Sequence, residues 1–286
     1  MSNSKFELGL ELLRQPVLPL VSMVEFFAMT GSFSSVQDII NELPQPIETK
    51  YTIYKDPAVL LAPYLDLMEG LIKSTSVDQP IELVNENNEE LDPMVVRSSW
   101  IKQQILTLEL EKINSALCGP CNCTLCCTGP QRAMQQEFFE IPLKDGELNS
   151  FEDCSKIDSE ESRTRLPMDE DELVHDGLPF WASLEPNIIH WKNGWSLILP
   201  KKTSCPNLIL ENGRCRTYDT RPLVCRRPQI FPYIMEQLDD HNSNKFRLRN
   251  IILAITDCPY VTELQDEITG YIAACELEPI FMRNKQ

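Results

Sequence analysis

The segment Cys118-Gly-Pro-Cys-Asn-Cys-Thr-Leu-Cys-Cys127 places five cysteines within ten residues. A second segment, from Cys205 through Cys215 to Cys225, adds three cysteines at equal spacing. A packed core does not need thiols at this density, because Ala or Val fills the same volume without a reactive group. The two segments therefore predict that the chain binds something through sulfur.

Disulfides, a redox dithiol and a metal are three competing uses for such cysteines. Disulfides form in compartments reached through a secretory signal, but Glu7 and Glu11 interrupt the start of the chain and the cysteine count of 11 is odd. Cys118-Gly-Pro-Cys121 has the spacing of a thioredoxin-like dithiol, yet that motif follows a strand, whereas 106–117 has the pattern of a helix end. Metal binding is the strongest of the three interpretations.

The ligand types restrict which metal is bound. The chain has three histidines, His175, His190 and His241, and none has zinc-finger spacing to a cysteine. All-thiolate sites favour zinc or an iron–sulfur cluster. Neighbouring side chains of an extended segment point to opposite sides, so Cys126 and Cys127 serve two centres, or one of them is a packing or reactive thiol.

The predicted ligands lie in the two segments or shortly after them. They are Cys118, Cys121, Cys123, Cys126, Cys127, Cys205, Cys215, Cys225 and Cys258. Cys154 is isolated from both segments and is interpreted as a bystander, and Cys275 as a small buried apolar residue. The sequence does not assign any catalytic residue, and whether the protein is an enzyme stays open.

Turn signals predict how the second segment brings its cysteines together. Asn212-Gly213 between two apolar stretches is typical of a hairpin, which would carry Cys215 towards Cys205. Asp219-Thr-Arg-Pro222 is a helix start, so Cys225 would lie on a helical turn. Arg221 and Arg226 are expected to donate hydrogen bonds to the thiolates; pairing with acidic surface residues is an equally weighted alternative.

Composition excludes several functions. The chain of 286 residues is 42% hydrophobic and 24% charged, as in globular proteins. A formal net charge of −17 disfavours binding to nucleic acids or anionic membranes. The most apolar stretch, 17–29, contains Glu25 and is shorter than the roughly 20 residues that a bilayer requires. We therefore expect a cytoplasmic protein that binds neither nucleic acid nor membrane.

The predicted fold class is α+β, with a helical N-terminal region before a small cysteine-rich metal-binding domain of short strands, a hairpin and C-terminal helices. The expected divisions are 1–115 for the helical region, 116–260 for the metal-binding domain with an acidic insertion at 144–176, and 261–286 for a closing helix. The helical region is interpreted as a scaffold or as a docking site for a protein partner.

Several single elements are also predicted. Residues 94–117 have the pattern of one long helix, and 137–143 and 195–200 read as strands. The polar stretch 74–92 is expected to be a solvated linker. Residues 247–256 fit either a helix or a strand.

The same residues resemble a known family. The motifs are Cys123-x-x-Cys126-Cys127, Cys205-Pro-x-Leu, Gly213-x-Cys215-x-x-Tyr218, Arg221-Pro-x-x-Cys225-Arg226 and Cys258-Pro259. They are similar to those of the YkgJ-type cysteine-cluster proteins, a CxxCxxCC family described as chelating zinc or iron. One position departs from the pattern, because Pro120 stands where the family has a cysteine and Cys118 and Cys121 lie close by. The resemblance covers about half of the chain, from Cys118 to Pro259.

The resemblance and the residues together lead to three functional expectations. The first is an all-cysteine iron–sulfur centre, such as a [4Fe–4S] cluster, with a role in redox chemistry or protein modification, because the thiols outnumber the ligands of one zinc. The second is a zinc-stabilised interaction module without enzymatic activity. The third follows from a related pattern in flagellin lysine N-methylases, which resemble this family, and is an enzyme that modifies protein side chains.

Overall fold

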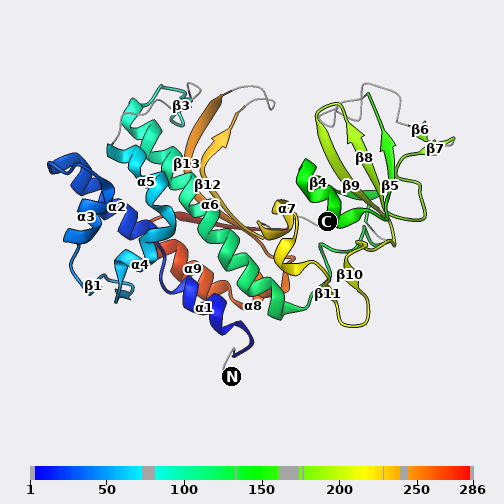
Figure 1. The fold of residues 1–286 in the computed structure, drawn as a ribbon, viewed down its shortest axis with the longest axis horizontal. Helices are drawn as coiled ribbons and strands as arrows, with labels where there is room; N and C mark the ends of the chain where they lie inside the picture. The colour runs from blue at the N-terminus through cyan, green and yellow to red at the C-terminus, as the bar shows by residue number, and fades with distance from the viewer. Residues whose placement is uncertain are drawn as a thin grey trace. The chain divides into compact units, whose positions relative to one another are not determined.

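The computed structural model describes residues 4–72, 81–132, 134–160, 174–175, 177–227, 229–238 and 244–283. They form an α+β protein of two compact units, whose helices and strands are labelled in Figure 1. Unit 1 contains the described residues up to Leu117 and those from Gln229 to Arg283. Unit 2 contains the described residues between 118 and 228.

This division differs from the expected one at its C-terminal side. Residues 229–260, expected in the metal-binding domain, belong to unit 1, where their strands pair with a strand from the N-terminal region. Residues 261–283 belong to the same unit and contain the end of one helix, a second helix and a strand rather than a single closing helix. Pairing between distant segments leaves no local sequence signal, which explains the difference.

The described part of unit 1 is mainly helical, with a four-stranded mixed sheet and a separate pair of short strands. Its helices are α1 (Glu7–Leu13), α2 (Leu18–Thr30), α3 (Val36–Glu42), α4 (Pro57–Leu61), α5 (Leu65–Ile72), α6 (Pro93–Cys121, whose last residues belong to unit 2), α8 (Pro259–Glu263) and α9 (Gln265–Ala274). Its strands are β1 (Ile47–Glu48), β2 (Ile53–Tyr54), β3 (Glu82–Val84), β12 (Ile230–Gln237), β13 (Lys245–Ile255) and β14 (Glu278–Met282).

Unit 2 is built mainly from strands. These are β4 (Phe138–Leu143), β5 (Ser155–Asp158), β6 (Val174–His175), β7 (Leu178–Pro179), β8 (Asn187–Trp191), β9 (Gly194–Pro200), β10 (Leu208–Ile209) and β11 (Arg214–Cys215). Two 3-10 helices, η3 (Asp145–Phe151) and η4 (Tyr218–Thr220), and the short helix α7 (Leu223–Arg226) complete it.

The sheet of unit 1 is organised around β13. Strand β12 pairs with it in antiparallel orientation, and β14 and β3 pair with it in parallel orientation. The expected linker 74–92 therefore contains a strand; Leu83 and Val84 are each 1% exposed. The acidic residues that follow these two positions made the short apolar strand hard to recognise in the sequence. Residues 73–80 lie outside the described residues.

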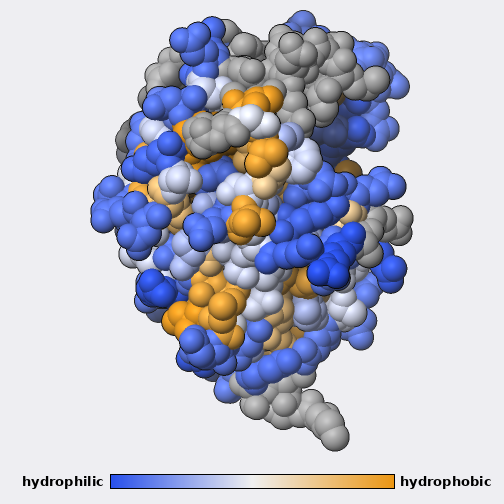
Figure 2. Space-filling view, turned by 90° about the vertical axis from the view of Figure 1, so that its right-hand side faces the viewer, coloured by the Kyte–Doolittle hydropathy of each residue, from blue (hydrophilic) through white to orange (hydrophobic). Residues whose placement is uncertain are grey.

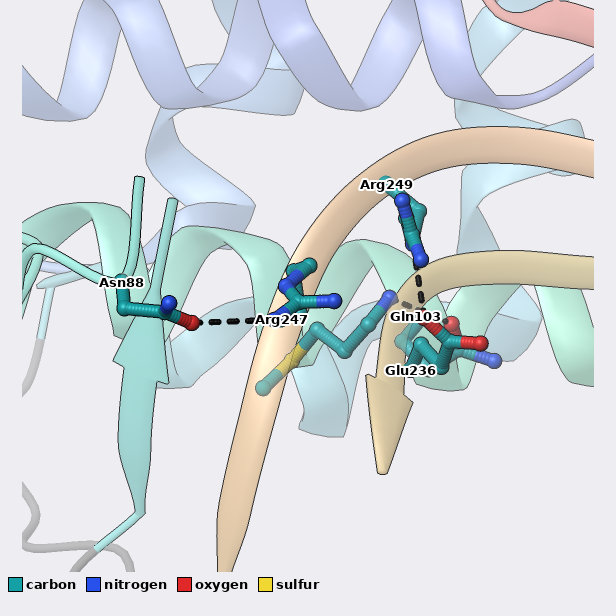
Figure 3. Close-up of polar contacts among 6 residues, drawn as sticks. Asn88, Gln103, Glu236, Arg247 and Arg249 are labelled. Carbon is teal, nitrogen blue, oxygen red and sulfur yellow. Dashed lines mark hydrogen bonds and ion pairs between the residues drawn. The ribbon is translucent and has the colours of Figure 1, made fainter. Parts of the chain in front are cut away.

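Helix α6 contacts the sheet through side-chain amides. Two residues of β13 face one of β12 between the pairs Tyr233↔Ile251 and Met235↔Leu248, which forms a β-bulge. Gln103 accepts hydrogen bonds there from the amides of Ile234 and Met235 and donates to the carbonyl of Pro232. Figure 3 shows Gln103 close to the ion pair of Arg249 and Glu236.

A second amide acts about three helical turns further along α6. Asn114 is 2% exposed, and it exchanges hydrogen bonds with the backbone of Ile230 and accepts one from the hydroxyl of Tyr260. Because buried polar groups must be paired, these contacts fix the position of α6 on β12 and α8.

Another face of α6 carries a buried carboxyl group. Glu109 is 5% exposed and accepts hydrogen bonds from the amide of Val17 at 2.8 Å and the hydroxyl of Tyr271 at 2.9 Å. Burial raises the pKa of Glu109 from 4.5 to about 7, although both hydrogen bonds and the charge of Lys112 act in the opposite direction. The group joins α6 to the start of α2 and to α9.

The N-terminal helices are strongly apolar. Glu7–Thr30, which comprises α1 and α2, is the one stretch among the described residues that is long and apolar enough to cross a membrane. In the structure the stretch is interrupted before Leu18 and buries Leu10, Leu13, Leu20 and Val24 in the core. Core helices of globular proteins have the same composition, so the stretch is weak support for a membrane span.

The face of the molecule drawn in Figure 2 is mostly hydrophilic and carries separate hydrophobic groups. Scattered apolar side chains of this kind are normal on protein surfaces.

The main sheet of unit 2 has the strand order β4-β9-β8-β5. Both faces are covered: Leu143, Phe151 and Leu197 belong to one buried cluster, and Ile189 and Ile198 to another. The predicted strands 137–143 and 195–200 are confirmed as β4 and β9.

The expected acidic insertion is partly an integral element of unit 2. Its first half forms η3 and β5, and Phe151 is only 3% exposed. Strand β5 pairs with β8 in parallel orientation, which extends the sheet. Residues 161–173 and 176 of the insertion lie outside the described residues.

We predict that Glu109 makes stability depend on pH. Its folded pKa lies above the unfolded value, so the folded state holds the proton more tightly and the free energy of unfolding falls as pH rises from about 4.5 to about 7. The full effect is roughly 3 kcal/mol. Glu109→Gln keeps the shape of the side chain but cannot titrate. The free energies of unfolding of the two proteins, measured with denaturant, should therefore differ more as pH rises from about 4.5 to about 7. A constant difference would contradict the assignment.

Candidate metal centre

The first cysteine segment begins on a helix. Helix α6 continues to Cys121, so Cys118 and Cys121 lie on its last turn, and the predicted helix 94–117 is confirmed but longer. Pro120 is inside this turn and lacks the amide hydrogen needed to continue the helix. Asn122 then has a positive φ of 54°, a conformation that ends helices. The chain leaves α6 in a turn that contains the remaining cysteines of the segment.

Backbone pairing joins the first segment to the second. The amide of Cys205 donates to the carbonyl of Cys127 at 2.7 Å, and the amide of Gly129 donates to the carbonyl of Thr203 at 2.9 Å. A Cβ at Gly129 would overlap the carbonyl oxygen of Pro200. Only glycine allows so close an approach of the two backbones.

The predicted hairpin of the second segment is confirmed. Strands β10 and β11 pair with Leu208 opposite Cys215, and Gly213 adopts a φ of +68° in the turn. A Cβ at Gly213 would lie 3.3 Å from the carbonyl oxygen of Asn122, so the turn packs against the end of the first segment. The hairpin therefore carries Cys215 back to the part of the chain that follows Cys205.

Cys225 lies on helix α7, as predicted. Glu147 of η3 accepts a hydrogen bond from the amide of Leu223 at 2.7 Å and one from the amide of Lys144 at 2.8 Å. The carboxylate satisfies an amide at the start of α7 that has no partner within the helix. Glu147 therefore fixes the helix that carries Cys225.

A buried arginine contacts the first segment from the second. Arg221 is 7% exposed, and its guanidinium donates to the sulfur of Cys118 at 3.8 Å and to the carbonyl of Tyr218 at 2.8 Å. The guanidinium also lies 3.6 Å from the centre of the Tyr218 ring. A Cβ on Gly119 would be 3.0 Å from the Tyr218 hydroxyl, so α6 passes directly over this ring. The positive charge of Arg221 thus lies beside a thiol.

The thiols of both segments influence one another. Burial raises the pKa of Cys225 to about 12, and the neighbouring Cys126, Cys205 and Cys215 contribute in the same direction. Burial also raises the pKa of Cys205 to about 11, with Cys215, Cys154 and Cys126 adding to the effect.

The pKa of Cys118 rises too, mainly through burial and then through Cys126, while Arg221 acts in the opposite direction. Cys126 thus adjoins cysteines of both segments. Thiols with such raised pKa values stay protonated at neutral pH, and coordination to a cation is the usual way to ionise them.

The residues fit a thiolate-bound metal by their chemistry. The cysteines of the two segments that influence one another's pKa are Cys118, Cys123, Cys126, Cys205, Cys215 and Cys225. Within the described part of the chain, no three Cys, His, Asp or Glu side chains already stand where they could hold a metal ion. The thiols would therefore draw together on binding, as metal ligands of small domains commonly do.

The other predicted ligands have different surroundings. Cys121, on the last turn of α6, and Cys127, whose carbonyl pairs with Cys205, are both partly buried in unit 2. Cys258 belongs to unit 1, where it precedes α8 and is 5% exposed. The roles of these three residues and of Arg226, which follows Cys225 in α7, stay predictions.

Two histidines can also be placed. His190 stacks on Trp195 with ring centroids 3.8 Å apart and pairs with Asp158, so it has partners other than the cysteines. His175 lies in β6, and His241 is outside the described residues.

Sequence reasoning missed three residues near the cysteines. Cys154, interpreted as a bystander, packs against the same buried cluster as Cys205 and raises the pKa of that thiol. Glu147 was assigned to a surface insertion. Gly129 belongs to a turn signal, and the sequence does not indicate that another backbone segment lies against it. The only available signal for Glu147 was its own position, as an acidic residue four positions after the end of a predicted strand.

Comparison with known proteins identifies the segment that holds the cysteines. Residues 117–250, just under half of the chain, match the model of a family named CxxCxxCC and described as a "Putative zinc- or iron-chelating domain". The match begins at the end of α6 and extends into β13 of unit 1, and Cys258 lies beyond it. No curated protein and no solved structure matches the chain significantly.

We predict that Gly129→Ala separates the two cysteine segments. The added methyl group would overlap the carbonyl of Pro200, and overpacking of this kind costs about 1–3 kcal/mol. Metal retained against a chelator should fall at least about tenfold. Gly146→Ala is the matched control, since nothing lies within 4 Å of its Cβ. Equal metal retention by both variants would show that the close approach is unimportant.

We also predict that Glu147→Ala weakens metal retention. The change removes a charged acceptor from the amide of Leu223, which is worth about 1–3 kcal/mol, so the loss should be about tenfold. Glu152→Ala removes the same charge from an exposed position of the neighbouring turn and should bind metal as the unchanged protein does. Similar losses in both variants would indicate a general charge effect.

Proposed function

We propose that unit 2 holds an iron–sulfur cluster through cysteines of both segments, in a cytoplasmic protein with a role in redox chemistry or protein modification. The observation that carries the proposal is the contact between the two cysteine segments, in which the amide of Cys205 donates to the carbonyl of Cys127 and Arg221 donates to the sulfur of Cys118. A cluster would supply one-electron transfer at this place. The CxxCxxCC match supports zinc or iron without distinguishing them.

Two features favour a cluster over a single zinc ion. The six cysteines of the two segments that influence one another's pKa, directly or through Cys126 and Cys118, exceed the four ligands that a structural zinc site uses. Arg221 donates to the sulfur of Cys118 from a buried position, and hydrogen bonds to sulfur are one means by which proteins set the potential of a cluster. A zinc-stabilised interaction module is the alternative, since arginine would steady zinc ligands equally well.

Metal analysis of protein purified without oxygen decides between these functions. An iron–sulfur protein should contain iron and acid-labile sulfide in near-equal amounts and absorb broadly in the visible range. Zinc without sulfide would overturn the cluster and support the interaction module. Neither metal in a folded protein would overturn both.

We predict that Cys225→Ser loses the metal. Its thiol is partly buried on α7 and interacts with three other cysteines, and the serine hydroxyl is a poor substitute for a soft thiolate ligand. Cys275→Ser is the matched control, because Cys275 is 6% exposed and lies directly after α9 in unit 1. Metal content should fall several-fold in the first variant and stay unchanged in the second. Full metal content in Cys225→Ser would show that the ligands are assigned incorrectly.

A further inference from the structure

Helix α2 exposes large apolar side chains that the fold of unit 1 does not cover. Its sequence, Leu-Pro-Leu-Val-Ser-Met-Val-Glu-Phe-Phe-Ala-Met-Thr, has one charged residue. One face packs into the core, yet Phe26 and Met29 are each 61% exposed and Phe27 is 38% exposed. A helix that is apolar on all sides is normally buried, so the outer face of α2 lacks a cover in the described structure.

This face borders a groove of about 420 Å³. One wall comes from α2 and the other from the segment between α3 and β1. The lining residues are Pro19, Ser22, Met23, Phe26, Phe27, Leu43, Pro44 and Ile47. The residues of α2 recur at intervals of three and four, so the groove follows that helix for about two turns.

The chain segment that forms the groove carries charge of one sign. Between Gln15 and Thr49 the chain has no basic residue and four acidic ones. Glu25 is paired with Lys102 at 2.7 Å. Asp38, Glu42 and Glu48 are exposed, and the last two directly flank the lining residues Leu43 and Ile47. The groove is therefore apolar inside and acidic at its edge.

We propose that the groove binds an amphipathic helical segment of a partner protein that carries basic residues beside its apolar face. Two turns of apolar groove accept side chains spaced three or four residues apart, which is how amphipathic helices dock. The acidic edge complements Lys or Arg on the flanks of such a segment. Charge disfavours the other occupants, because a second copy would place acids against acids and an anionic membrane would be repelled.

The test uses a fluorescein-labelled synthetic helix of leucine and lysine, about five turns long, and its counterpart with glutamate in place of lysine. Anisotropy titrations with the full chain measure both affinities. The lysine peptide should bind and the glutamate peptide should not. Phe26→Ser, which leaves the net charge unchanged, should weaken binding about tenfold. Leu184→Ser, at a side chain 94% exposed in unit 2, is the matched control and should have no effect.

A second pair of variants separates local charge from the net charge of the chain. Glu42→Gln with Glu48→Gln should weaken binding of the lysine peptide and reduce its dependence on salt. Glu185→Gln with Glu211→Gln removes the same charge from exposed positions of unit 2 and should change neither.

Equal effects of the two pairs, or equal binding by Phe26→Ser and the unchanged protein, would overturn the proposal. Two further results would overturn it by identifying another occupant. One is binding to neutral phosphatidylcholine vesicles that Phe26→Ser abolishes, which would indicate a membrane. The other is a dimer in sedimentation that the same change converts to a monomer, which would indicate a second copy.

Discussion

The cysteine site depends on the backbone pairing of residues 127–129 with residues 203–205. The two segments are about eighty positions apart, so closing the loop between them costs entropy that only specific contacts can offset. The missing side chain of Gly129 permits this pairing, since any larger residue would meet the carbonyl of Pro200. The thiols on each side are then close enough to alter one another's pKa values.

Around this pairing, polar contacts hold each cysteine-bearing element in place. Arg221 contacts the end of α6, and Glu147 holds the start of α7. Asn207, which is 6% exposed, donates to the carbonyl of Ser150 and so ties the second segment to η3. Contacts of this kind hold the cysteine-bearing elements near one another, although no three potential ligands among the described residues already stand where they could hold a metal ion.

Local patterns predicted much of this from the sequence. The long helix before Cys118, the hairpin at Asn212-Gly213 and the helical turn at Cys225 each follow from spacing and turn residues, and each is present. Long-range pairing could not be predicted in the same way. Three features depend on contacts between distant segments. They are the pairing of strand β3, the inclusion of residues 229–260 in unit 1, and the approach of Cys154 to Cys205. The acidic stretch that surrounds Glu147 concealed its role, because composition describes a whole segment and not one side chain.

The path of the chain has a consequence for synthesis on the ribosome. Unit 2 is continuous between 118 and 228, whereas unit 1 combines segments made before and after it. Strand β3 pairs with β13, which is translated about 160 residues later. The described residues of unit 2 are therefore all synthesised before β12, β13 and β14, the strands that complete unit 1. The cysteine-bearing part can take up its metal on the nascent chain, and the helical part is completed last.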